Sequence, residues 1–104
     1  PEVLRYWLVN NEYEIAGESV VEDSGTLYQI IDAVFGGRTK LTDAELFVGK
    51  RALVNDEDLY TRQLETVLSR FERALSGMYG REGEPRFTLY RCIRQQLLEM
   101  RDQT

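Results

Sequence analysis

The sequence contains no histidine, a single cysteine and only two prolines among its 104 residues. Without histidine there can be no Ser-His-Asp or Cys-His nucleophilic site, and the commonest general base near neutral pH is missing. A zinc site needs roughly four cysteine or histidine ligands, and Cys92 is the only candidate. We therefore expect no catalytic residues, no metal and no cofactor, and we predict that the protein is not an enzyme.

Long apolar runs, leader segments and phosphate-binding glycine loops are also missing. No run reaches the roughly 18 apolar residues of a membrane span, and no charged-then-apolar leader opens the chain. The glycines at positions 77, 80 and 83 lack the Lys-Ser/Thr ending of a phosphate loop. Because Cys92 has no disulfide partner, we expect a cytoplasmic protein. Without a long apolar run or a phosphate loop, we also expect no membrane span and no small-molecule substrate.

Acidic residues outnumber basic ones, and the two signs are unevenly spread. The chain has 18 Asp and Glu against 13 Lys and Arg, a net charge of −5. Residues 1–59 carry 5 basic and 12 acidic side chains, whereas residues 60–104 carry 8 arginines and 6 acids. Phosphate binding is driven by Lys and Arg, so the net charge argues against a nucleic-acid partner. Both halves are interpreted as solvated faces, with the alternative that the two ends recognise different surfaces.

The N-terminal residues alternate between apolar and polar side chains. We predict that Val3 to Val9 and Glu12 to Ile15 pair as a hairpin around Asn10-Asn11, because asparagine tolerates the positive φ of a two-residue turn. This register leaves Trp7 on the polar face of the hairpin. The second strand is expected to continue to Val21.

Residues 25–35 are predicted to form a helix that covers the apolar face of this hairpin. Asp23 or Ser24 would cap it, and Gly36-Gly37 would end it. The evidence is apolar residues at helical spacing, namely Leu27, Ile30, Ile31 and Val34.

Residues 44–48 and 51–54 are predicted to be two short strands joined by a tight turn at Gly49-Lys50, since aromatic and β-branched residues flank the glycine. A competing interpretation begins a helix at Thr42, with Glu45 completing a capping box.

The strongest helix signal spans residues 56–79, with Asn55 as its predicted cap. Its apolar stripe is interpreted as packing on the protein's own core, with a homodimer through residues 60–78 as the alternative. Residues 80–85 are a predicted loop, 86–93 fit either a strand or a helix, and 95–102 are predicted helical. The stripe consists of Tyr60, Leu64, Val67, Leu68, Phe71, Leu75 and Met78.

The predicted order of hairpin, helix, strand, Gly-Lys turn and strand resembles the ubiquitin-like β-grasp. The stretches that carry the resemblance are residues 18–27, 46–50 and 55–59. Under this alignment residues 87–94 supply the last strand, and the 56–79 helix is an insertion. Glu45 and Arg91 depart from the pattern, because they fall where the family buries an aliphatic side chain.

The resemblance implies a sheet face that binds protein partners. It assigns Leu46 to the centre of that face, Gly49 and Lys50 to the neighbouring turn, and Cys92 to the last strand. Independently of any family, an exposed Trp7 would be a suitable interface anchor, since aromatic side chains give much contact area at little rotamer cost.

We therefore expect one α+β domain over residues 1–104, a decorated β-grasp. Its expected function is that of a non-catalytic interaction module, an adaptor or scaffold with a protein partner in a larger assembly. The alternative is an N-terminal hairpin with a mostly helical remainder, acting as a small dimeric regulator of a transcription or enzyme complex.

Overall fold

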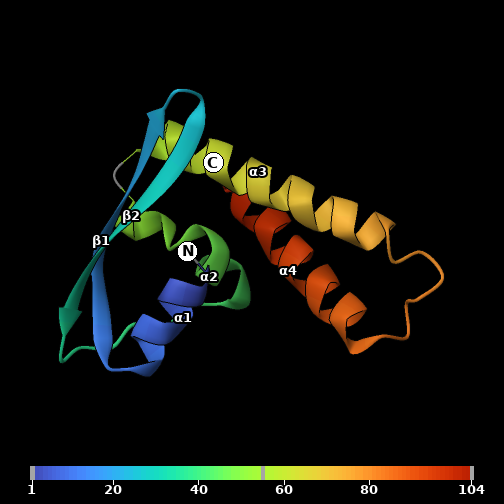
Figure 1. Ribbon diagram of the computed structural model, residues 1–104, viewed down its shortest axis with the longest axis horizontal. Helices are drawn as coiled ribbons and strands as arrows, with labels where there is room; N and C mark the ends of the chain where they lie inside the picture. Colours follow the sequence, from blue (N-terminus) through green and yellow to red (C-terminus); the bar gives the residue numbers. More distant parts are fainter. Residues whose placement is uncertain (1, 55, 104) are drawn as a thin grey trace.

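The computed structural model describes residues 2–54 and 56–103, which form an α+β structure with two lobes (Figure 1). One lobe is a long β-hairpin with two short helices beside it, and the other is a pair of long helices that projects away. The longest extent of the molecule is 44 Å. In chain order the elements are α1 (Glu2–Asn10), β1 (Tyr13–Asp23), β2 (Thr26–Phe35), α2 (Asp43–Val48), the 3-10 helix η1 (Arg51–Leu53), α3 (Glu57–Ser76) and α4 (Pro85–Asp102).

The N-terminal segment is a helix, so the hairpin predicted around Asn10-Asn11 is wrong. Both asparagines end α1: the side-chain amide of Asn10 donates to the Tyr6 carbonyl at 2.8 Å, and that of Asn11 donates to the Trp7 carbonyl at 2.7 Å. Arg5 and Leu8, one turn apart, are the buried residues of α1. Because these two buried residues are about one helical turn apart, a helix places both of them on the same inward face.

The helix predicted over residues 25–35 is also wrong, because this segment is strand β2, antiparallel to β1. Ser24 and Gly25 have φ values of 53° and 82°. Positive φ at both central positions is the geometry of the tight turn whose twist matches a hairpin. Exposure then alternates along β2, with Leu27 half-buried and Tyr28 exposed.

A bulge between Ile15 and Gly17 changes the alternation along β1. Ile15, Glu18 and Val20 are consequently all buried. Because a bulge adds one residue to one strand, it brings residues three apart onto the same face. It is this bulge that turns Glu18 toward the interior.

The competing interpretation of residues 42–54 is the correct one. The backbone amide of Glu45 donates to the Thr42 hydroxyl at 3.2 Å, and that of Thr42 donates to the Glu45 carboxylate at 2.9 Å. This reciprocal capping box begins α2, and η1 follows where the second strand was predicted. The described residues contain a sheet of only two strands, so the β-grasp prediction is wrong.

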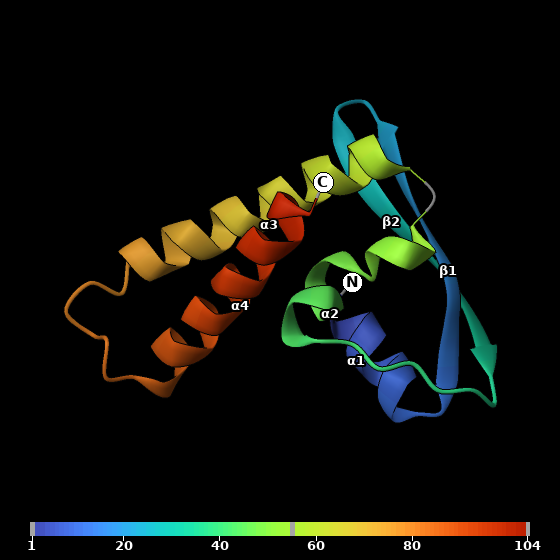
Figure 2. The same cartoon turned by 180° about the vertical axis from the view of Figure 1, so that it is seen from behind.

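The helix predicted over 56–79 is observed as α3, and residues 86–94 belong to α4. The Asp56 side chain caps α3 by accepting from the Leu59 amide at 3.0 Å; the predicted cap Asn55 lies outside the described residues. Figure 2 shows α3 and α4 lying side by side. The apolar stripe of α3 is buried, and most of it packs with Ile93 and Leu97 of α4 and with Ala44 and Val48 of α2, so it is not free to form a homodimer.

None of the described helices is long and apolar enough to cross a membrane. The cytoplasmic location stays a prediction.

Candidate functional site

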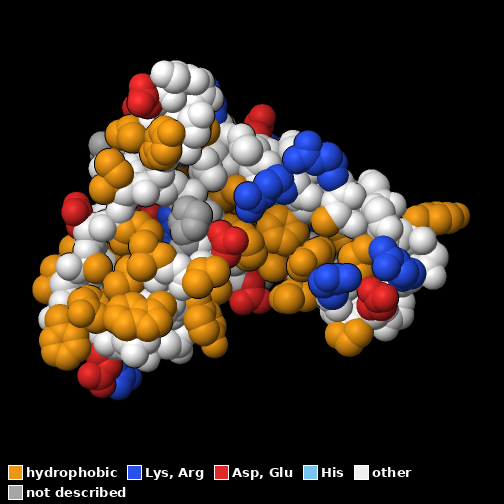
Figure 3. All heavy atoms as spheres, in the orientation of Figure 1, with side chains coloured by type: hydrophobic (Ala, Val, Ile, Leu, Met, Phe, Trp, Pro, Cys, Tyr) orange, Lys and Arg blue, Asp and Glu red, His pale blue; other side chains and the backbone are white. Residues whose placement is uncertain are grey.

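The far end of the α3–α4 pair is rich in arginine. Residues 70–94 contain six arginines and three acids, although the whole chain is acidic. In Figure 3 basic side chains gather over α3 and α4. The amphipathic pattern explains this placement: the apolar stripe of each helix faces the other helix, so the charged residues point outward.

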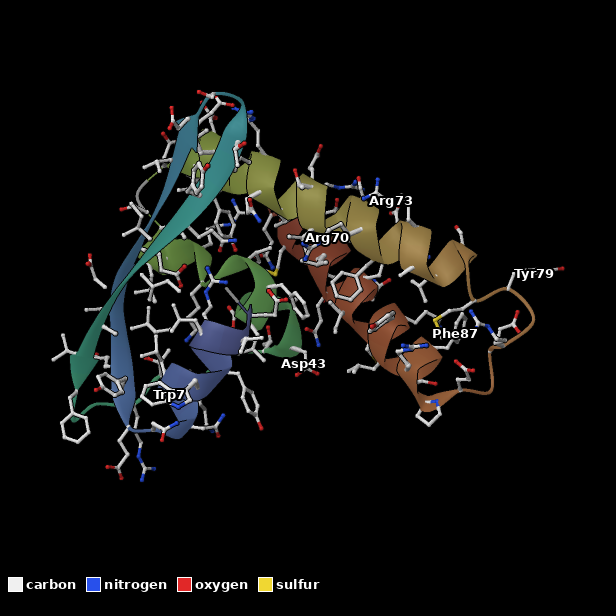
Figure 4. The ribbon with its side chains drawn as sticks, viewed as in Figure 1. Trp7, Asp43, Arg70, Arg73, Tyr79 and Phe87 are labelled. Carbon is white, nitrogen blue, oxygen red and sulfur yellow. The ribbon has the colours of Figure 1, made fainter. Side chains whose placement is uncertain are left out.

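An open groove of about 770 Å³ lies at this end, where the loop joins the two helices. Figure 4 shows Tyr79 pointing away from the molecule at the end of α3. Its side chain is 90% exposed, the highest value among the large apolar residues of the described chain. We call this region the tip groove. It is lined by Glu72, Leu75, Ser76, Tyr79, Glu82, Phe87, Arg91 and Arg94.

Several arginines around the tip groove have capacity to bind an anion. Among the described residues, no hydrogen bond or ion pair involves the side chain of Arg73 or Arg91. The Nε atom of Arg94 is buried and lacks a hydrogen-bond partner. A buried donor without a partner is costly, and an oxygen acceptor from a ligand would satisfy it.

Two acids, Glu72 and Glu82, line the tip groove together with Arg91 and Arg94. A hydrogen bond from the Gly80 backbone amide lowers the pKa of Glu82, and the N–O distance is 3.1 Å. Glu82 therefore holds the loop in place. The neighbouring Glu84 carboxylate lies 4.0 Å from the Arg86 guanidinium.

A second polar cluster is buried in the other lobe. Arg5 is completely buried, and its guanidinium donates to both carboxylate oxygens of Glu18 and to the Gln29 side chain. It also donates to the Leu46 carbonyl at 2.9 Å. These bonds connect α1, β1, β2 and α2, so we interpret the cluster as structural: it holds the lobe together.

Gly49 and Tyr60 extend this cluster to α3. The Tyr60 hydroxyl donates to the Gly49 carbonyl at 2.8 Å, and burial raises the pKa of Tyr60 to about 12. The Arg51 guanidinium lies 5.0 Å from the centre of the Tyr60 ring. The position of α3 relative to the hairpin lobe is therefore set by buried contacts.

The residues predicted for protein binding do not form one surface. Trp7 lies on α1, is 51% exposed and packs near the Tyr13 ring at 5.6 Å. Leu46 and Lys50 are half-buried and Gly49 is buried, and Leu46 and Gly49 lie beside the Arg5–Glu18 pair. Cys92 is exposed on α4, in the other lobe. Their role in binding stays a prediction.

Arg5, Tyr79 and the arginines of the tip groove were not predicted from the sequence. The available signal was the excess of arginine over acidic residues in residues 60–104, which the net charge of the whole chain does not show. Exposed Tyr79 sits between Met78 and Gly80, just after the helical stripe, a position typical of a loop. Arg5 gave no signal, because a single charged residue in an apolar stretch is usually solvated.

No curated protein matches the sequence. One solved structure with a similar fold is a protein of the NADB-Rossmann superfamily from Streptococcus agalactiae, with a TM-score of 0.72 and 24% identity. Another is Sp1610 from Streptococcus pneumoniae, a candidate tRNA (m1A22) methyltransferase solved in complex with S-adenosyl-L-methionine, with a TM-score of 0.67 and 20% identity. Each match covers 96% of this chain but only 43% and 42% of the other chain.

Residues 1–97 match the tRNA (adenine(22)-N(1))-methyltransferase family, TrmK. This match corrects the resemblance to ubiquitin and the expectation of a non-catalytic adaptor or scaffold, because the family is one of enzymes. It also corrects the expected partners, since the family acts on tRNA and Sp1610 binds a small molecule. The chain belongs to the tRNA (adenine(22)-N(1))-methyltransferase family.

Proposed function

We propose that this chain acts in the methylation of an adenine N1 in tRNA, and that the α3–α4 pair supplies part of the tRNA-binding surface. The observation that carries the proposal is the family match over residues 1–97. The arginines of the tip groove indicate which part of the chain contacts the RNA.

The chemistry of the tip groove suits RNA. Arginine side chains that neutralise phosphates release counterions, which drives association with nucleic acid. Exposed aromatic rings such as Tyr79 offer a surface on which an unpaired base can stack. The overall charge of −5 does not oppose this, because 12 of the 18 acids lie within residues 1–59.

The described residues do not have the arrangement that binds a cofactor such as the methyl donor. Dinucleotide and related cofactors bind at the carboxyl ends of parallel strands, where a glycine-rich turn leads into a helix. Here the sheet has two antiparallel strands, and the turn between them leads from strand to strand. We therefore assign binding of S-adenosyl-L-methionine to a part of the enzyme other than these residues.

Replacing both Arg73 and Arg91 by glutamine should weaken tRNA binding roughly tenfold, because two phosphate contacts are lost. Fluorescence anisotropy with a labelled tRNA transcript measures the affinity at several salt concentrations. The slope of log affinity against log salt should become less steep by about 1 to 2.

The matched control replaces Arg38 and Lys40, which are exposed on the hairpin lobe, by glutamine. This variant loses the same charge and should bind tRNA as the original chain does. If both double variants weakened tRNA binding equally, only the total charge of the chain would determine the affinity. That result would contradict an RNA site at the tip groove.

A further inference from the structure

We infer that the groove between the hairpin tip and α3 binds a second stretch of the tRNA backbone, and that Arg62 exchanges the Glu22 carboxylate for an RNA phosphate when it does. The inference rests on the proposed function, because it takes RNA to be the substrate. It concerns other residues than those of the tip groove, which lies farther along α3.

This second groove lies where the two lobes meet, and its volume is about 660 Å³. Figures 1 and 2 both show the tip of the hairpin beside the first turns of α3. We call this region the hairpin groove. None of the described residues that line it is acidic. They are Gly25, Thr26, Leu27, Tyr28 and Gln29 of the hairpin and Arg62, Gln63, Thr66 and Arg70 of α3.

The arginines of the hairpin groove belong to one row along α3. Arg62, Thr66 and Arg70 are four residues apart and exposed, so they lie on the same face of the helix. Arg73 continues this row, and Figure 4 shows it beyond Arg70 in the direction of the tip groove. At a rise of 1.5 Å per residue, the backbones of Arg62 and Arg70 are about 12 Å apart. A single small anion bridges that distance poorly, whereas a chain of phosphates can contact both.

The groove also has free hydrogen-bonding groups. Within the described part of the chain, the side chains of Arg70 and Gln63 make no hydrogen bond or ion pair. The Thr66 hydroxyl donates to the Arg62 carbonyl at 2.9 Å, so its oxygen can still accept. Neutral donors and acceptors beside arginines suit a ribose-phosphate backbone, since each RNA ribose carries a 2′-hydroxyl.

Arg62 already holds an anion at the edge of the groove. Its guanidinium forms an ion pair with Glu22 at the hairpin tip, and the two side chains are 51% and 38% exposed. The hydrogen bond from Arg62 lowers the pKa of Glu22, so this carboxylate is charged at neutral pH and competes with a phosphate. Exposed ion pairs contribute little to stability. A phosphate can therefore take the place of Glu22 without unfolding the hairpin.

Replacing both Arg62 and Arg70 by glutamine should weaken binding of a labelled tRNA transcript by the isolated chain roughly tenfold, because two phosphate contacts are lost. Fluorescence anisotropy at several salt concentrations measures this, and the slope of log affinity against log salt should become less steep by about 1 to 2. The matched control is again the double glutamine variant of Arg38 and Lys40, which should bind as the original chain does.

The exchange at Arg62 has a test of its own. Glu22→Gln should tighten tRNA binding about two- to fivefold, because the competing carboxylate is removed. Glu12→Gln removes the same charge from an exposed residue at the other end of β1, roughly 30 Å away, and should leave the affinity unchanged. In a chain that already carries Arg62→Gln, the Glu22 change should have no effect.

Unchanged tRNA affinity of the Arg62/Arg70 variant would overturn the inference. If the Arg73/Arg91 variant still weakened binding, the proposed function would stand without it. Equal tightening by Glu22→Gln in the presence and absence of Arg62 would contradict the exchange, because the effect would then come from total charge.

Inorganic phosphate is titrated into the same chains by isothermal titration calorimetry. No binding, or weak binding that the Arg62/Arg70 variant leaves unaltered, is the expected result. Binding of inorganic phosphate that the Arg62/Arg70 variant abolishes, together with unchanged tRNA affinity, would assign the hairpin groove to a free anion and contradict an RNA site there.

Discussion

Replacing Glu18 by glutamine should destabilise the protein by about 3–5 kcal/mol, because it leaves the buried Arg5 charge without its counter-ion. Arg5 is 0% and Glu18 4% exposed, so water cannot replace the lost carboxylate. The remaining partners of Arg5, which are the Leu46 carbonyl and the Gln29 side chain, carry no charge. Urea denaturation followed by circular dichroism measures the change in the free energy of unfolding.

The matched control is Glu22→Gln, which removes a carboxylate from the exposed ion pair with Arg62 at the hairpin tip. This change should leave the urea midpoint almost unaltered, since exposed pairs contribute little. Similar midpoints for the Glu18 and Glu22 variants would contradict a structural role for the buried pair.

Replacing Gly49 by alanine should cost about 2–4 kcal/mol, because strain and a clash add together. Gly49 has a φ of 82°, a conformation that disfavours any side chain. An added Cβ would lie 2.6 Å from a carboxylate oxygen of Glu18. That carboxylate cannot move aside, because Arg5 holds both of its oxygens.

Gly80→Ala is the control that separates the two effects. Gly80 has nearly the same φ, 85°, but nothing lies within 4 Å of its added Cβ. It should therefore lose only the strain contribution, about 1–2 kcal/mol. Thermal unfolding of both variants checks this, and an equal loss of stability would show that the contact with Glu18 is unimportant.

The C-terminal half of the fold was the more predictable half. A stripe that repeats over some 20 residues, as in α3, is a strong signal, because chance rarely maintains helical spacing for so long. The N-terminal half was predicted wrongly because its elements are short or their sequence patterns fit more than one structure. Asn10-Asn11 suits both a tight turn and a helix end, and here both side-chain amides donate to carbonyls of α1.

The hairpin shows how turn chemistry outweighs periodicity. Leu27, Ile30, Ile31 and Val34 fit helical spacing, yet Ser24-Gly25 adopts two positive φ values that start a strand. The β-branched residues of this segment favour a strand as well. Interpreting this turn as a helix cap supplied the helix of the β-grasp order, and the wrongly predicted N-terminal hairpin and 44–54 strands supplied the rest.

Function was harder to predict, because the residue types that this sequence lacks are not needed for every reaction. Methyl transfer depends on positioning a donor and an acceptor, which requires neither histidine nor a thiol in this chain. Net charge was equally misleading, since the acids of residues 1–59 hide the arginines of the tip groove. Local charge on one helix pair is the informative quantity for RNA binding.

The most direct test of this account is to titrate the isolated 104-residue chain separately with a tRNA transcript and with S-adenosyl-L-methionine, using isothermal titration calorimetry. The account predicts salt-dependent binding of tRNA and no heat of binding for the methyl donor. Binding of S-adenosyl-L-methionine without binding of tRNA would contradict it, because the chain would then hold the donor site rather than part of the RNA-binding surface.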